Sequence, residues 1–241
     1  MTIANNTLYR IDSTEIFVTN AVFDGALAQT AVISNNTLSK INETGIAQGS
    51  FVRGGGEVNQ GLTISGNTID VPDGFAGIDL FQSVGFGAGS VTQNGVISNN
   101  TVTGGPEFGL LSYARVRDSA NAVVSQTFLV TGNHFSDDFA GVAIRGSAEG
   151  AVNSPKINGS WTLAGNTITN NFRGVEVLGS NSPVTENVFL SSAGVTNTIT
   201  GNTVGVYGHT FNGALVTIDR GQNILNGVNG TGTAGNATFS N

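Results

Sequence analysis

Apolar and polar positions along this chain follow a unit of six residues that recurs seven times. The unit reads apolar, small, Asn or Gly, Asn, Thr (His in one copy), apolar, as in Ile-Ser-Asn-Asn-Thr-Leu at 33–38. The copies begin at residues 3, 33, 64, 97, 130, 163 and 199, so the repeat is 30 to 36 residues long. A repeat of this length indicates a solenoid, a propeller or an array of similar units.

The residues between the copies predict three short strands per repeat. The first strand crosses the unit itself, with a bend at the paired Asn-Asn or Gly-Asn. The second follows a Gly, as in Gly-Val-Ala-Ile at 141–144, and we assign this Gly to a corner with positive φ. The third precedes the next unit, as in Ser-Trp-Thr at 160–162. Longer loops rich in Gly, Ser and Asn are expected within 49–60, 82–94, 112–126, 146–160 and 178–194.

These strands are expected to stack in parallel. Helices are disfavoured because Gly, Asn and Thr are poor helix formers and no helical apolar period is present. A propeller blade needs about four antiparallel strands in ~40–50 residues, which is more than this repeat holds. Stacking superimposes one amide per turn, and buried amides without partners are costly, so the amides should form a continuous hydrogen-bonded ladder. Its predicted members are Asn6, Asn36, Asn67, Asn100, Asn133, Asn166 and Asn202.

With these units in place, the chain resembles the right-handed parallel β-helix proteins of the pectate-lyase-like superfamily. The resemblance rests on the pattern I-x-x-N-x-I followed by G-I-x-V and covers residues 3–220. It implies an all-β fold of about seven coils of ~33 residues with an internal Asn ladder. We expect one domain over 1–241, with a weakly patterned tail at 221–241. The superfamily includes polysaccharide lyases, hydrolases, epimerases, phage tailspikes and adhesins, so the resemblance leaves the function open.

Composition narrows the range of partners. Only 10% of the 241 residues are charged, 39% are hydrophobic, and the net charge is −7. The lysines are Lys40 and Lys156 alone, so the chain lacks the basic footprint of a nucleic-acid-binding protein and is not attracted to anionic membranes. Without cysteine, disulfides and thiolate metal sites are excluded.

The sequence also suggests a location. No basic segment followed by an apolar run opens the chain, and no apolar run reaches the ~20 residues needed to span a membrane. The repeat starts at Ile3, directly after Met1. We therefore expect an extracellular or cell-surface module from a longer secreted repeat protein, although a short open reading frame fits equally well.

One group of titratable residues, over the third to sixth coils, is a candidate site. By the resemblance, carboxylates would hold calcium and a uronate, and an Arg would abstract a proton; hydrolases would instead use paired carboxylates. Calcium is thus the one cofactor that the resemblance suggests, with Asp79, Asp137 and Asp138 as candidate ligands. The catalytic candidates are His134, Asp137, Asp138, Arg145 and Glu176.

The catalytic motifs of the superfamily are incomplete in this chain. The adjacent pair Asp137-Asp138 is similar to that of the polygalacturonase-like hydrolases, but Asn-Thr is never followed by Asp, and Arg-Ile-Lys is absent. His209 lies two coils beyond the pair and is expected to pack at the end of the coil. The aromatic residues that could form a sugar platform are Phe81, Phe86, Tyr113 and Trp161.

Three functions remain open from the sequence. The first is a non-catalytic structural or adhesive module that binds glycan and associates with itself through open coil ends. The second is a polysaccharide lyase or glycoside hydrolase with its groove over the third to sixth coils. The third is a phage or surface fibre that binds glycan without cleaving it.

Overall fold

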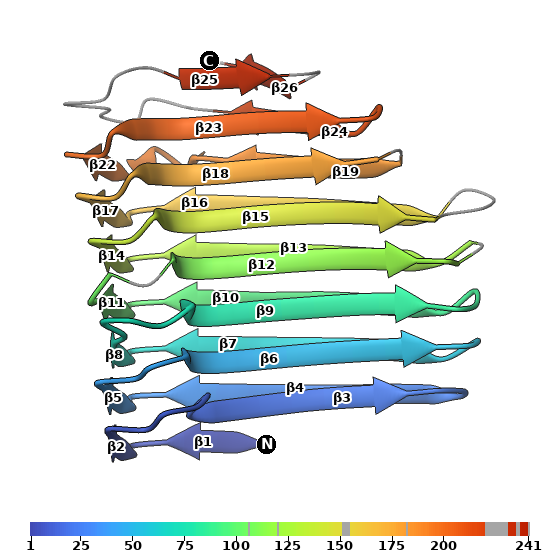
Figure 1. Ribbon diagram of the computed structural model, residues 1–241, viewed down its shortest axis with the longest axis horizontal. Helices are drawn as coiled ribbons and strands as arrows, with labels where there is room; N and C mark the ends of the chain where they lie inside the picture. The colour runs from blue at the N-terminus through green and yellow to red at the C-terminus, as the bar shows by residue number, and fades with distance from the viewer. Residues whose placement is uncertain are drawn as a thin grey trace.

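The chain forms a parallel β-solenoid. The computed structural model describes residues 1–105, 107–119, 121–150, 155–181, 183–219, 231–234 and 237–240. Every regular element among these residues is a β-strand. About seven turns of about 32 residues stack along one axis, and Figure 1 shows them as a column of parallel arrows from the blue N-terminal turn to the red C-terminal one. The expected all-β solenoid is confirmed.

The strands form three long sheets, and each turn contributes one strand to each sheet. Sheet A holds β1 (Thr2–Ala4), β4 (Ala26–Ser34), β7 (Glu57–Ser65), β10 (Ser90–Ser98), β13 (Val123–Thr131), β16 (Lys156–Ala164), β19 (Val184–Phe189), β24 (Leu215–Asp219) and β26 (Ala237–Ser240). Sheet B holds β2 (Thr7–Tyr9), β5 (Thr37–Ser39), β8 (Thr68–Asp70), β11 (Thr101–Thr103), β14 (His134–Ser136), β17 (Thr167–Thr169) and β22 (Thr198–Thr200). Sheet C holds β3 (Ile16–Val22), β6 (Thr44–Arg53), β9 (Ala76–Gly85), β12 (Phe108–Arg117), β15 (Ala140–Glu149), β18 (Arg173–Ser180), β23 (Val204–Phe211) and β25 (Thr231–Ala234).

The bend between sheets A and B lies where the sequence predicts it. In the turns from Asn6 to Asn166 the residue before the ladder Asn has a positive φ, as at Asn35 (55°), Gly66 (64°), Asn99 (54°) and Gly132 (65°). Asn and Gly tolerate this left-handed conformation better than other residues do. The alternation of Asn and Gly at this position therefore follows from one backbone requirement.

The Asn ladder lies at this bend. Each Nδ2 donates to the Oδ1 of the Asn one turn further on, over 2.8 to 2.9 Å, and the backbone N–H donates to the same oxygen. Most of the Nδ2 groups also donate to a carbonyl of the preceding turn, as Asn100 does to Ile64 over 3.0 Å. From Asn36 onward the amides are buried, and these bonds satisfy them away from water. The members are Asn6, Asn36, Asn67, Asn100, Asn133, Asn166 and Asn197.

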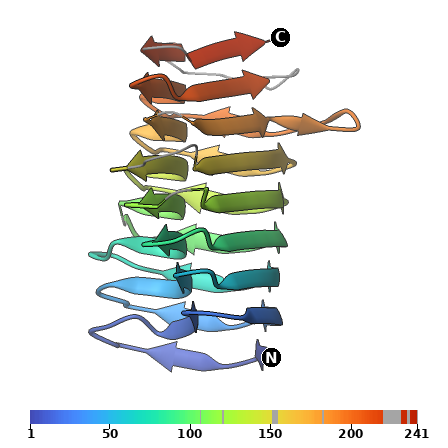
Figure 2. The ribbon, with the colours of Figure 1, turned by 90° about the vertical axis from the view of Figure 1, so that its right-hand side faces the viewer.

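The prediction that Asn202 is the last member of this ladder is wrong. A small antiparallel hairpin, β20 (Ser191–Ser192) and β21 (Val195–Thr196), is inserted between sheets A and B in this turn, and Figure 2 shows an orange hairpin extending beyond the stack. After the hairpin the chain returns to register at Asn197, and β22 pairs with β17 from Thr198 onward. The unit predicted to start at 199 would place the ladder Asn at 202 and the sheet B strand from Thr203; both lie five residues earlier, at Asn197 and Thr198.

Asn202 belongs to a second, shorter ladder at the corner between sheets B and C. The Nδ2 and backbone N–H of Asn171 both donate to its Oδ1 over 2.9 Å. One turn earlier, the backbone N–H of Asp138 donates to the Oδ1 of Asn171 over 2.9 Å. A carboxyl group thus occupies a ladder position that amides hold in the next two turns.

The Gly at the second position of five sheet C strands, β6, β9, β12, β15 and β18, has a different role from the one predicted. None of Gly45, Gly77, Gly109, Gly141 and Gly174 has a positive φ. A Cβ at each of them would lie 2.2 to 2.6 Å from the nearest atom of the next turn. These glycines therefore allow adjacent turns to approach closely, and the assignment to a left-handed corner is wrong.

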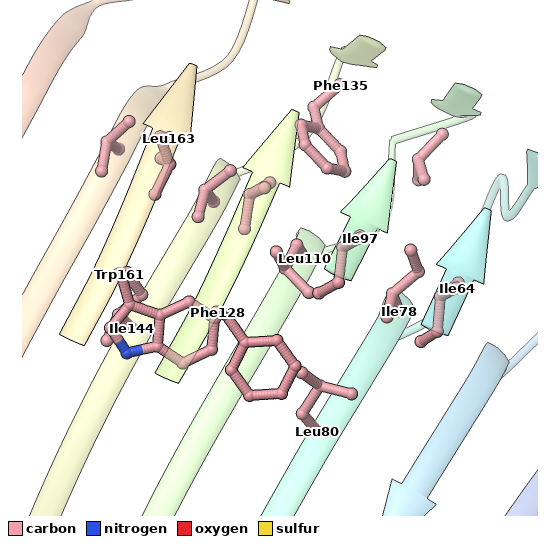
Figure 3. Packing of buried hydrophobic residues seen from close by; sticks show 14 of the residues in the cluster. Ile64, Ile78, Leu80, Ile97, Leu110, Phe128, Phe135, Ile144, Trp161 and Leu163 are labelled. Carbon is pink, nitrogen blue, oxygen red and sulfur yellow. The ribbon is translucent and has the colours of Figure 1, made fainter. Parts of the chain in front are cut away.

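Apolar columns fill the interior. Phe128 and Trp161 stack in adjacent turns, with ring centroids 4.6 Å apart and an angle of 12° between the planes (Figure 3). Gly95, one turn before Phe128, leaves room for that ring, because a Cβ there would lie 2.6 Å from it. Trp161 has no exposed surface, so its prediction as part of a sugar platform is wrong.

A row of buried amides also crosses the interior. Gln60 points inward from sheet A, between the inward residues Val58 and Leu62. In the next two turns the same position holds Gln93 and Gln126. The Nε2 of Gln93 donates to Gln60 over 3.0 Å, and further bonds reach across to amides and serines of sheet C. This row lies between two hydrophobic clusters of the core, and the six-residue unit does not predict it because the glutamines lie outside the unit.

The C-terminal segment is more regular than expected. Within the predicted tail, β25 pairs with β23 and β26 pairs with β24, so both extend existing sheets. The alternation Ala237-Thr238-Phe239 supplies the period of two that a strand requires. Residues 221–230, 235, 236 and 241 of that tail lie outside the described residues.

Candidate binding face on sheet C

The outer face of sheet C carries most of the cations and several of the exposed rings. Parallel pairing places one residue of each turn beside its equivalent in the next, so outward side chains form rows along the axis. Five of the seven arginines lie on this face. They are Arg53, Arg115, Arg117, Arg145 and Arg173.

Three rings from successive turns form an aromatic row. Phe51 on β6, Phe81 on β9 and Tyr113 on β12 have ring centroids 5.3 and 5.6 Å apart. Their planes are tilted by 46° and 54° to one another, so the row is corrugated. Phe81 and Tyr113 occupy the same outward position in register, and Phe51 occupies the next outward position along its strand.

The row leads into a groove of about 410 Å³. Tyr113 and Arg145 occupy the same outward position on adjacent strands, followed by Leu178 one turn later. Leu111 and Ser147 contribute to the floor and wall. An apolar groove with a few polar groups is the usual form of a small-molecule or oligomer subsite.

Arg145 and Glu176 meet at the side of this groove, as two of the candidate site residues. The Nε and Nη2 of Arg145 donate to the Oε1 of Glu176 over 2.9 and 2.6 Å, and the Nη1 of Arg173 donates to Oε2. The Glu176 side chain has no exposed surface. Both carboxylate oxygens are therefore held by guanidinium groups and are unavailable to a substrate proton or a metal ion.

Aromatic rings support the two arginines. The Cζ of Arg145 lies 4.5 Å from the ring centroid of Phe108, and the Cζ of Arg173 lies 4.2 Å from that of Tyr207. Cations over ring faces gain electrostatic stabilisation, most strongly when partly desolvated. The network therefore fixes one wall of the groove with a net charge of +1.

Asp79 lies on the same face but not in this network. In register, Leu111 and Ala143 separate Asp79 from Glu176, which makes the separation three strand spacings, about 14 Å. Paired carboxylates of glycoside hydrolases stand about 5 to 9.5 Å apart. Burial raises the pKa of Asp79 to about 6. Asp79 and Glu176 are therefore too far apart to act as such a pair.

The segment 134–138 lies elsewhere. His134 is on sheet B, in the row otherwise held by Thr, and Asp137 is exposed with a φ of 68° at the corner between sheets B and C. Asp138 is 4% exposed, and its two carboxyl oxygens have no hydrogen-bond partner. Burial, with a smaller contribution from the charge of Asp137, raises the pKa of Asp138 to about 9.

The predicted cluster therefore separates into three parts. Arg145 and Glu176 form one, Asp79 another, and the segment 134–138 the third. Among the described residues, no three of His, Cys, Asp or Glu are grouped so that they could hold a metal ion, and the calcium ligands suggested by the sequence, Asp79, Asp137 and Asp138, do not converge.

The other histidine packs near the C-terminal end of sheet C. His209 Nδ1 lies 3.0 Å from the hydroxyl of Tyr207, and its ring centroid lies 3.9 Å from that of Phe211. Phe86, the remaining ring suggested for a sugar platform, is 61% exposed and lies beside Arg53.

Comparisons with known proteins assign no family. A scan against protein-family models, a search of curated proteins and a search of solved structures each gave no match. The described residues contain no helix long and apolar enough to cross a membrane.

Proposed function

We propose that this protein is a non-catalytic glycan-binding module. An extended polysaccharide lies along the solenoid axis on the outer face of sheet C. The observation that carries this proposal is the aromatic row of Phe51, Phe81 and Tyr113, with its ring centroids 5.3 and 5.6 Å apart in successive turns. The groove beside Arg145 continues the same line.

The chemistry of this face suits a sugar chain. The C–H faces of sugar rings pack on aromatic rings, and the polar edges take hydrogen bonds from neighbouring groups. Tyr113 offers a hydroxyl beside its ring, and the groove is lined by Ser147 and Ser180. A row that repeats once per turn binds a polymer better than a single compact ligand, because neighbouring contacts act together.

The lyase or hydrolase alternative receives less support. That reading required Asp79, Arg145, Glu176 and the segment 134–138 to come together on one concave face, but of these only Arg145 and Glu176 meet. Glu176 is engaged by two arginines, and about 14 Å, three strand spacings, separates it from Asp79. We therefore propose binding without cleavage.

We further propose that the module belongs to a larger secreted or surface protein and serves adhesion. Its low charge and its stacked interior suit a rigid spacer. Among the described strands of sheet C, β3 pairs with β6 only, and such an edge favours association with a second copy. Light scattering should then show a concentration-dependent increase in mass, and a strict monomer at all concentrations contradicts this association.

A glycan array followed by calorimetry tests the binding proposal. Phe81→Ala and Tyr113→Ala should each weaken binding by about tenfold or more, because buried aromatic contacts dominate such interfaces. Phe189→Ala is the matched control, since Phe189 is a 42% exposed ring on sheet A, away from the row. Equal losses in all three variants, or no binding by any glycan, would refute the proposal.

A second measurement separates binding from cleavage. The bound glycan is incubated with the protein, and the absorbance at about 235 nm reports unsaturated uronate while a reducing-end assay reports hydrolysis. Binding without product supports the module. Product that forms with the wild type and is lost in Asp79→Asn would instead establish an enzyme and identify its acid.

A further inference from the structure

A second pocket of about 280 Å³, which borders the aromatic row at Phe51 and Phe81, lies on sheet C towards the corner with sheet A. Three arginines line it, Arg53 from β6 and Arg115 and Arg117 from β12. The strand between them, β9, contributes the small residues Ser83 and Gly85 to this position. Long cationic side chains therefore stand on both sides of a low floor.

The register explains this arrangement. Arg53, Gly85 and Arg117 pair in successive strands, so Arg53 and Arg117 are two strand spacings, about 10 Å, apart at the backbone. Ser83 likewise separates Arg115 from the ring of Phe51. Guanidinium groups on extended side chains can reach across this distance toward one small ligand.

Aromatic rings form the rest of the wall. Phe51, Phe81 and Phe86 line the pocket, and the Cζ of Arg53 lies 5.8 Å from the ring centroid of Phe86. Apolar walls lower the local dielectric, so each cation interacts more strongly with a bound anion than it would on an open surface.

The three arginines are incompletely neutralised. The Nη2 of Arg115 pairs with Glu149 over 2.5 Å, and Arg117 Nε lies 3.3 Å from Asp118 in an exposed pair. Arg53 makes no ion pair with a described residue, and the Nε of Arg115 is buried without a hydrogen-bond partner. A net positive pocket in a chain of net charge −7 is a local feature and not a general property of the surface.

From these observations we infer that Arg53, Arg115 and Arg117 form a binding site for a tetrahedral oxyanion, a sulfate or phosphate group. One guanidinium fork satisfies the two oxygens of a carboxylate. Three arginines around one pocket supply more donors than a carboxylate can accept, whereas a tetrahedral dianion offers four oxygens and two charges. The hydroxyl of Ser83, on the strand between the arginines, adds a donor.

Anion binding is measured on the intact protein by calorimetry with sodium sulfate, inorganic phosphate and sodium acetate, at an ionic strength held constant with chloride. Sulfate and phosphate should bind at least about tenfold more tightly than acetate. Acetate binding as tight as sulfate would overturn the choice of a tetrahedral anion, and no binding of any of them would overturn the site.

Variants locate the site. Arg53→Gln and Arg117→Gln should each weaken sulfate binding by about tenfold, whereas Arg10→Gln, an arginine outside the pocket, should leave it unchanged. Ser83→Glu places a carboxylate on the floor and should abolish sulfate binding while raising the melting temperature in sulfate-free buffer. Equal losses in Arg10→Gln would show that sulfate binds through overall charge, which contradicts the pocket.

The site does not depend on the glycan proposal. Inorganic sulfate tests the pocket alone, and Phe189→Ala, which lies on sheet A outside it, should leave sulfate binding unchanged. A sulfated and an unsulfated form of one disaccharide then distinguish a free anion from a sulfate group on a sugar. If the protein prefers the sulfated form and Arg53→Gln removes that preference, the pocket binds a sulfated glycan. If inorganic sulfate binds but the protein shows no such preference, the pocket binds a free anion.

Discussion

Glu186 provides a direct test of how much a buried charge destabilises this solenoid. It occupies the inward position that Gln60, Gln93 and Gln126 hold in earlier turns, but the turn before it carries Gly159 there. The carboxyl group fills the space beside that Gly, has no exposed surface and has no hydrogen-bond partner by geometry. The indole N–H of Trp161 borders the same space. It lowers the pKa of Glu186, but by less than burial raises it.

Burial raises the pKa of Glu186 from 4.5 to about 8. The folded protein therefore binds this proton more tightly than the unfolded chain does. The stabilisation from protonation is complete below about pH 4.5 and is lost as the pH rises to about 8. Each pKa unit corresponds to about 1.4 kcal/mol, so the full loss is on the order of 4–5 kcal/mol, a large part of the stability of an ordinary domain.

Glu186→Gln removes this titration while keeping the shape of the side chain. Guanidinium unfolding at pH 5 and at pH 8.5 should show similar stability for the two proteins at the lower pH and a variant more stable by about 3–5 kcal/mol at the higher pH. Hydrogen exchange of the backbone amides should show that the wild type loses protection at pH 8.5 mainly in β16 and β19, because solenoids unfold locally.

The control for this experiment is Glu57→Gln, since Glu57 is exposed on sheet A. It should follow the wild type at both pH values. Asp138 also has a raised pKa and contributes to the pH dependence of every variant, so the difference between wild type and Glu186→Gln is the decisive quantity. Parallel pH profiles for these two proteins would refute the argument, because they would mean that Glu186 ionises in the fold at no cost.

Three further substitutions test the fold. Asp138→Asn completes the second ladder with an amide and should raise stability at pH 7 by about 2–4 kcal/mol in guanidinium unfolding; no gain would mean that the carboxyl already ionises in place. Asn100→Ala leaves buried donors of Asn67 unpaired and should cost about 2–4 kcal/mol, whereas Asn6→Ala at the exposed end of the ladder should cost less than about 1 kcal/mol. Gly141→Ala should lower the melting temperature, with a cost of about 1–3 kcal/mol, because its Cβ would lie 2.6 Å from Ile168; an unchanged melting temperature would show that the turns can separate.

The ladder is the part of the fold that a sequence can predict. A buried amide needs a partner in the turns above and below, so Asn recurs once per turn at the same place. Asn36, Asn67 and Asn100 illustrate this, because each accepts from the preceding turn and donates to the next. Fold class follows from that recurrence together with the apolar residues that flank it.

The seventh turn shows where the same reasoning fails. The segment Ile199–Val204 matches the repeated unit, but its Asn202 belongs to the corner between sheets B and C. Amide ladders can form at either corner, and the six-residue unit does not distinguish them. The distance from Asn166 could have done so: Asn197 is 31 residues further on, close to the other spacings, and Asn202 is 36.

The candidate site was predictable only in part, for a related reason. Loop lengths between turns vary, so distance along the chain does not show which outward residues share a row. Arg145 and Glu176, 31 residues apart, meet because they lie in adjacent turns, while Asp138, seven residues from Arg145, turns inward at a corner. Arg53 and Arg117 are 64 residues apart, two repeats of 32, and that spacing was a signal in the sequence that went unused.

The separation of inward from outward residues explains why this fold predicts so little about its ligand. Inward positions must match the turns above and below, so ladder amides, apolar columns and close-contact glycines constrain one another. Outward positions face solvent and meet only the same position in the adjacent turns. A row such as Phe81, Tyr113 and Arg145 can therefore change one residue at a time without disturbing the stack, and ligand specificity depends on rows that the repeat itself does not fix.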